Sequence, residues 1–185
     1  MGRTMFIADM HLGHENIIRL CNRPFDNVEQ MNAYMIQAWN AKVQTDDEVY
    51  ILGDVAFKFQ GNMLVKILNS LKGTKYLIIG NHDGRYLKDE NFKQCFAGIY
   101  DIKSMYLGNT RIVMCHYPLC EWEGYFRGAY HIYGHIHNTV NTNAYKIMST
   151  EERALNAGAD IISFTPATFE ELVMYNKQFR GMHKG

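Results

Sequence analysis

Hydrophobic residues in this chain occur as short continuous runs that alternate with longer stretches of helical periodicity. Residues 5–8, 48–52 and 75–79 contain apolar runs of the kind found in strands that are buried on both faces. Residues 28–43, between the first two runs, and residues 62–71, between the last two, carry apolar side chains at three- and four-residue intervals. This alternation of strand and helix predicts a layered α/β fold.

The second half of the chain predicts further strands. Gly108-Asn109 separates two strand-like segments, residues 99–107 and 110–115, and is a typical two-residue turn between antiparallel strands. The segments 130–133 and 154–157 have the composition of additional strands. A hairpin is therefore expected within a larger sheet.

Two pairs of polar residues have the spacing that begins a helix. Asn27 and Gln30 form a variant of the capping box before residues 28–43. Thr168 and Glu171 form a regular capping box, which predicts a helix that ends at about residue 178.

Length and charge limit what this chain can do. It has 185 residues, of which 47% are hydrophobic, and it contains no repeat or linker, so we expect one domain over residues 1–185. Its 19 basic and 19 acidic side chains cancel, which predicts no surface for duplex nucleic acid. The apolar runs are too short to cross a bilayer, so no membrane partner is expected. The first strand begins without a preceding signal peptide, which predicts a cytoplasmic location. No pattern in the chain indicates an oligomeric state.

The cysteines Cys21, Cys95, Cys115 and Cys120 lack a Cys-x-x-Cys spacing, and we interpret them as free thiols. Cys115 precedes His116, and a cysteine beside a histidine can be a nucleophile with its base. Adjacent residues of a regular strand face opposite sides, so the two side chains cannot line one cleft. A buried thiol behind the site is the interpretation we favour.

Residues that bind metals in proteins follow directly after several predicted strands. Asp9 and His11, and likewise His135 and His137, are two positions apart, a spacing that directs both side chains to one face of an extended backbone. Mixed carboxylate, amide and imidazole groups suit divalent ions, whereas thiolates would have indicated structural zinc. The candidate ligands are Asp9, His11, Asp54, Asn81, His116, His135 and His137.

Other residues near these segments suggest different roles. Asp54 follows Gly53, which permits a sharp turn, and its two oxygens suit a bridge between two ions. His82 points away from its neighbour Asn81, so we expect it to contact a phosphate oxygen or protonate the leaving group. His14 lies at the expected start of a helix, where it would touch substrate or support a ligand.

Taken in order, Asp-x-His, Gly-Asn-His-Asp and the other segments over residues 9–137 resemble the calcineurin-like metallophosphoesterases. Residues 155–160 resemble a segment that follows in small members of that family, and Ala8 is a departure that touches no ligand. The resemblance implies a four-layer αββα sandwich of two mixed sheets flanked by helices, with His82 as the catalytic histidine. It also implies two metal ions, one held by Asp9, His11, Asp54 and His137, the other by Asp54, Asn81, His116 and His135.

Such a centre would leave a cationic pocket for a phosphate group and a bridging hydroxide aimed at phosphorus. The hypothesis is therefore a phosphodiesterase or phosphomonoesterase for a small or nucleotide-like ester. Manganese is the expected assay metal, and iron, nickel, cobalt and zinc also suit these ligands. Two alternatives are an inactive scaffold of the same fold, which would have lost a ligand or His82, and a nuclease, which would need an appended duplex-binding domain.

Contacts to the substrate are less defined by the sequence. The loop 118–130, which contains Arg127, lies between two ligand segments and is a candidate lid. Asp83 and Arg85, which follow His82, are further candidates for substrate contact or support of the ligands.

Overall fold

A computed structural model describes residues 2–183 of the chain, and within them the strands form two mixed sheets. In the first sheet, β1 to β4 run parallel and β9 pairs antiparallel with β1. In order across that sheet, its strands are β4 (Gly98–Tyr100), β3 (Thr74–Ile78), β2 (Glu48–Ile51), β1 (Thr4–Ile7) and β9 (Ala167–Thr168).

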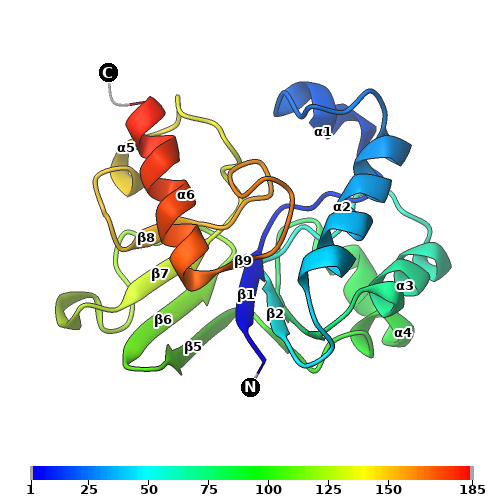
Figure 1. Cartoon of the computed structure of the whole chain (residues 1–185), viewed down its shortest axis with the longest axis horizontal. Helices are drawn as coiled ribbons and strands as arrows, with labels where there is room; N and C mark the ends of the chain where they lie inside the picture. Colours follow the sequence, from blue (N-terminus) through cyan, green and yellow to red (C-terminus); the bar gives the residue numbers. More distant parts are fainter. Residues whose placement is uncertain (1, 184–185) are drawn as a thin grey trace.

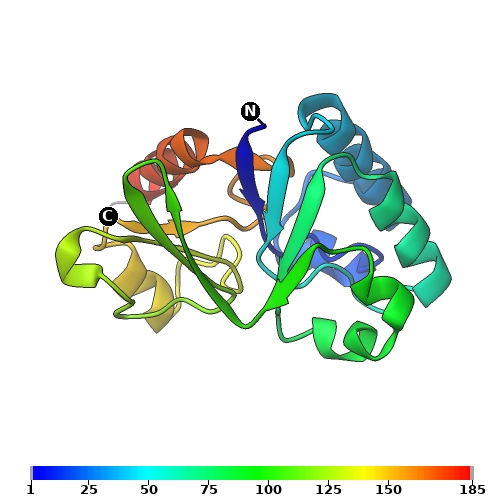
Figure 2. The ribbon, with the colours of Figure 1, turned by 90° about the horizontal axis from the view of Figure 1, so that it is seen from below.

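The second sheet begins with the predicted hairpin. β5 pairs antiparallel with β6, and β6, β7 and β8 are parallel. Its strands, in order, are β5 (Ile102–Leu107), β6 (Thr110–Cys115), β7 (Tyr130–Tyr133) and β8 (Ala154–Asn156). Figure 2 shows the two sheets facing each other in the middle of the molecule.

Helices cover the outer face of each sheet (Figure 1). Helices α2 and α3 lie outside the first sheet, and α5 and α6 lie outside the second. This is the expected αββα arrangement, and buried side chains from both sheets form its main core. The helical elements are α1 (Glu15–Leu20), α2 (Val28–Lys42), α3 (Gly61–Ser70), the 3₁₀ turn η1 (Asp83–Lys88), α4 (Glu90–Lys93), the 3₁₀ turn η2 (Tyr125–Arg127), α5 (Asn143–Met148) and α6 (Phe169–Met182).

The predicted caps begin α2 and α6. Thr168 accepts a hydrogen bond from the Glu171 N–H, and the Glu171 side chain accepts one from the Thr168 N–H, so this capping box is complete. Asn27 accepts a bond from the Gln30 N–H at 2.8 Å, but the Gln30 side chain accepts from Asp26 and not from Asn27. The α2 cap is therefore a variant, as expected.

Several elements differ from the sequence expectation. The predicted strand 99–107 is two strands, because the chain leaves the first sheet after Tyr100 and enters the second at Ile102. Ile99, Tyr100 and Ile102 lie on both sides of this change of sheet, so the strand-like composition gave no sign of the break. Helix α6 extends beyond residue 178 to Met182, and α5 and the two-residue strand β9 had no clear signal.

Within the described part of the chain, no helix combines the length and apolar character needed to cross a membrane.

Candidate metal centre

The candidate ligands come together where strands of both sheets end. Asp9 and His11 follow β1, Asp54 follows β2, and Asn81 follows β3 in the first sheet. From the second sheet, His116 follows β6, and His135 and His137 follow β7. Because parallel strands end at a common edge, residues distant in sequence meet there.

The backbone at these positions differs from the expected extended form. The φ angles are +55° at Asp9, +51° at His11, +53° at Asp54, +72° at His135 and +50° at His137. Residues other than glycine rarely adopt this left-handed backbone conformation, which costs about 1–3 kcal/mol for each residue. Residues in such strained conformations are concentrated at functional sites. The candidate ligands converge because the backbone turns at these residues. From the sequence, we expected them to converge because both side chains of each pair would lie on one face of an extended strand, and that explanation was wrong.

One group of donors contains Asp9, His11 and His137. An oxygen of Asp9 and one ring nitrogen from each histidine lie within 4.8 Å of one another. Both nitrogens of His11 are buried and have no hydrogen-bond partner. A buried imidazole without partners is costly unless another group binds its lone pair, so this set fits a metal ion.

A second group joins Asn81, His116 and His135. Asn81 Oδ1 lies 2.9 Å from His116 Nε2 and 3.0 Å from His135 Nδ1. His116 Nδ1 contacts the Leu52 carbonyl oxygen at 2.8 Å, which requires the proton on that nitrogen and leaves the Nε2 lone pair facing the centre. Neutral imidazole and amide oxygen are suitable donors for a divalent ion.

Asp54 lies between the two groups. Its Oδ2 atom is 3.5 Å from His11 Nε2 and 3.7 Å from His116 Nε2, and its Oδ1 accepts the backbone N–H of His82 at 2.8 Å. Asp54 therefore has one oxygen directed at both donor groups.

Burial shifts the pKa values of two candidate ligands. It raises the pKa of Asp9 to about 6, and it lowers the pKa of His11 to about 2. His11 is consequently neutral, as a ligand must be, and a nearby divalent cation would favour the ionised form of Asp9.

His82 and His14 lie beside the centre. His82 Nε2 is 3.9 Å from Asp54 Oδ2, and its side chain is 38% exposed, so one face is open to solvent. The His14 ring packs against His11 and Phe57, with centroid distances of 5.3 and 4.2 Å, and its Nδ1 is buried without a partner. Burial lowers the pKa of His14.

Asp83 connects two of the loops that carry candidate ligands. It is fully buried and accepts hydrogen bonds from the backbone N–H groups of Asp54, Val55 and Gly80 at 2.8–3.0 Å. It therefore ties the loop after β2 to the loop after β3. Arg85 is exposed in η1, and its guanidinium lies over the Tyr86 ring.

The structure does not place the loop 118–130 over the centre. Because β6 and β7 are parallel, the chain must return from the end of β6 to the start of β7, as Figure 1 shows. Glu123 pairs with Arg111 near the start of β6, and Trp122 is buried and donates to the Ala129 carbonyl. Arg127 is exposed on this return path, at the end of the strands opposite to the ligands, so the lid interpretation is not supported.

Sequence reasoning did not identify Arg23, Asn156 or Asp160 as part of the site. Asp160 Oδ2 contacts His137 Nδ1 at 2.9 Å, and the Asn156 side chain donates to the His137 carbonyl at 2.9 Å. Asn156 and Asp160 lie in residues 155–160, and the resemblance of this segment to a family segment is the one sequence signal for them. Arg23 lies after α1 and has no motif around it.

A family model described as calcineurin-like phosphoesterase matches residues 2–149. The chain belongs to the calcineurin-like phosphoesterase family. Membership indicates metal-dependent hydrolysis of phosphate esters. Two sets of side chains, Asp9 with His11 and His137, and Asp9 with Asp54 and His116, have ligand atoms close enough to hold a metal ion.

Relatives and a solved structure match over most of the chain. The uncharacterized protein MJ1445 of Methanocaldococcus jannaschii is 30% identical over 94% of this chain and 90% of its own length. The Gene 66 protein of a Mycobacterium phage is 26% identical over 76% of this chain and 80% of its length. The crystal structure of protein AQ665 of unknown function, from Aquifex aeolicus, has a TM-score of 0.74 and 27% identity, covering 92% of this chain and 97% of that one.

Proposed function

We propose that this protein is a two-metal phosphodiesterase or phosphomonoesterase that acts on a small or nucleotide-like phosphate ester. The position of Asp54 between two groups of donors is the observation that carries the proposal. One ion would be held by Asp9, His11, Asp54 and His137, and the other by Asp54, Asn81, His116 and His135.

Two divalent ions, when bound, supply positive charge for the phosphoryl oxygens and lower the pKa of water so that a nucleophile is available near neutral pH. The residues of this chain then have two tasks. The buried Asp9, His11, Asp54 and His116, with the more exposed Asn81, His135 and His137 beside them, would hold the ions. Asp54 fixes the separation of the two donor groups because both approach the same oxygen.

His82 is the proposed acid or phosphate-binding group. Its backbone N–H is tied to Asp54 Oδ1, while its ring is partly exposed beside the centre. From there, the imidazole would donate to a phosphoryl oxygen or to the leaving oxygen as negative charge develops.

The test of this function is metal reconstitution. Protein stripped with a chelator and reloaded with Mn²⁺ should hydrolyse bis-aryl and aryl phosphates, and Fe²⁺, Co²⁺, Ni²⁺ and Zn²⁺ should be compared with Mn²⁺ in parallel. Folded protein that binds metal but is inactive with every ion and both ester classes would contradict the proposal. Plasmid, single-stranded oligonucleotide and cyclic nucleotide substrates would show whether a nuclease activity is present.

The role of His82 has a separate test. H82A should bind both ions with unchanged stoichiometry while kcat falls about 100-fold or more, since a positioned general acid contributes about 10²–10⁴-fold. H183A, which removes an exposed histidine near the end of α6, is the matched control and should keep full activity. Loss of a bound ion in H82A would show that the residue is a ligand instead.

A further inference from the structure

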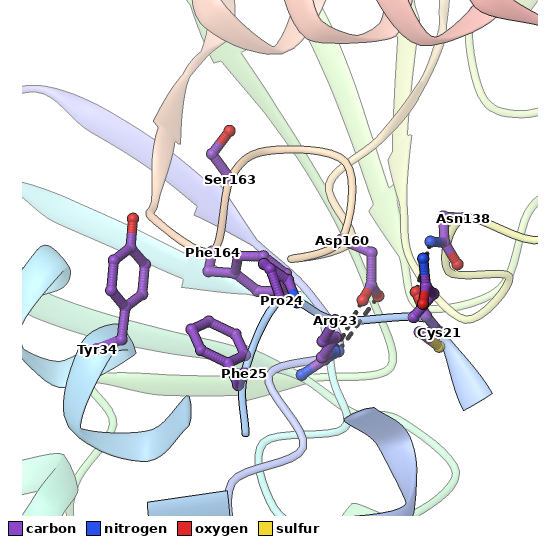
Figure 3. Close-up of a pocket in the computed structure, with 10 residues that line it drawn as sticks. Cys21, Arg23, Pro24, Phe25, Tyr34, Asn138, Asp160, Ser163 and Phe164 are labelled. Carbon is purple, nitrogen blue, oxygen red and sulfur yellow. Dashed lines mark hydrogen bonds and ion pairs between the residues drawn. The ribbon is translucent and has the colours of Figure 1, made fainter. Parts of the chain in front are cut away.

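A buried ion pair lies next to the candidate metal centre. Arg23 and Asp160 are 137 positions apart in the sequence, and their side chains are 0% and 1% exposed. Arg23 Nε donates to Asp160 Oδ1 at 2.8 Å, and Nη2 donates to Oδ2 at 3.2 Å. Dashed lines in Figure 3 mark the contact between the two side chains. A bidentate pair of this kind has a defined orientation as well as strength.

The same two side chains contact the residues that carry metal-binding groups. Arg23 Nη2 also donates to the Asp9 carbonyl at 2.8 Å, and Nη1 donates to the Met10 carbonyl at 2.9 Å. Asp160 Oδ2 contacts His137 Nδ1 at 2.9 Å. The pair is thus linked to the backbone at Asp9, where φ is +55°, and to the ring of His137.

We propose that Arg23 and Asp160 are positioning residues for the ion held by Asp9, His11 and His137, a proposal that rests on the function inferred above. Asp160 fixes the orientation of the His137 ring so that Nε2 is left for the ion. Arg23 holds the left-handed turn that directs the Asp9 carboxylate into the centre, by satisfying two carbonyls that the turn leaves without strand partners.

The surroundings of Arg23 require a guanidinium. Its planar group lies 5.5 Å from the centroid of the Phe164 ring, which restricts its orientation. Phe164 belongs to an aromatic cluster with Phe25 and Tyr34 that lines a cavity of about 440 Å³, and Arg23 and Asp160 form part of the cavity wall. A lysine cannot donate in one plane to Asp160 and to two carbonyls at once.

The experiment is titration of metal-free protein with Mn²⁺ by calorimetry, in wild type, D160N and R23K. D160N keeps the shape of the side chain but removes its charge. R23K keeps the charge but removes the planar guanidinium and its several N–H donors. We expect both to weaken one of the two Mn²⁺ sites by about 10–100-fold and to leave the other within about threefold, since removing such supporting contacts has effects of this size.

D47N is the matched control. Asp47 is also a buried carboxylate paired with an arginine, Arg3, but it lies before β2, at the strand ends opposite to the ligands. D47N should lower the thermal midpoint while both Mn²⁺ affinities stay at the wild-type value. A thermal melt followed by circular dichroism gives the loss of stability in every variant, which is then compared with its loss of Mn²⁺ affinity.

The outcomes separate this proposal from the function. Unchanged Mn²⁺ binding in D160N and R23K, or an equal loss of affinity in D47N, would overturn the positioning role. Wild type that binds two ions but hydrolyses no ester would contradict the function and leave the positioning role to be judged by affinity alone. Wild type that binds no divalent ion would overturn both.

Discussion

Substitution of Asp83 by asparagine tests whether a buried carboxylate holds the two central loops together. Asp83 Oδ2 accepts the N–H groups of Asp54 at 3.0 Å and Gly80 at 2.8 Å, and Oδ1 accepts that of Val55 at 3.0 Å. In D83N, the amide oxygen can replace Oδ2 and keep two of these bonds. The amide nitrogen then faces the Val55 N–H. Because both groups are donors, the Val55 N–H loses its hydrogen-bond partner.

The magnitude follows from these contacts. One buried N–H without a partner costs about 1–3 kcal/mol, and loss of the charge weakens each remaining bond by about 0.5–1 kcal/mol. Burial raises the pKa of Asp83, which shows that its charged form has a desolvation cost, and D83N removes that cost. The net loss of unfolding free energy is therefore about 2–3 kcal/mol. For a chain of this length, that corresponds to a thermal midpoint lower by about 4–12 °C.

The assay is urea unfolding of metal-free wild type and D83N, followed by circular dichroism, with Mn²⁺ affinity measured on the same samples. Both donor groups should bind Mn²⁺ more weakly, since Asp83 ties the loop that carries Asp54 to the loop that carries Asn81. A change in unfolding free energy below about 0.5 kcal/mol, with normal Mn²⁺ binding, would show that Asp83 does not hold the two loops together.

Two further predictions concern the strand ends. In G53A, the new Cβ would lie 2.6 Å from His116 Nδ1 at a φ of +84°, so we expect a loss of about 2–4 kcal/mol in urea unfolding together with weaker metal binding. G108A has a positive φ but open space around it, and it should lose only about 1–2 kcal/mol; equal losses in the two variants would rule out the clash. The hydrogen bond from Arg3 lowers the pKa of Asp47 to about 2, below the ordinary value of about 4, so its contribution to stability is present above pH 4 and is lost as the pH falls from about 4 to about 2. The difference in unfolding free energy between wild type and D47N should therefore shrink across that window, whereas exposed D46N should show no comparable change; a difference independent of pH would contradict the assignment.

The kinds of element, and a set of candidate ligands that the structure brings together, were predictable from the sequence. Strand runs, helical periodicity and the Thr168–Glu171 cap depend on neighbours within a few positions, so local patterns contain them. The candidate ligands could be proposed because each follows a strand, and strand ends are where such folds present functional loops.

Tertiary structure decided how these residues meet. The left-handed turns at Asp9, His11, Asp54, His135 and His137 are held by contacts from other parts of the chain, and local propensity disfavours them. The contact of Asp160 with Arg23 joins positions 137 apart, and no local pattern encodes it. The return of residues 118–130 away from the centre follows from the parallel pairing of β6 with β7. These features depend on which strands become neighbours, and that choice is made by packing of the whole chain.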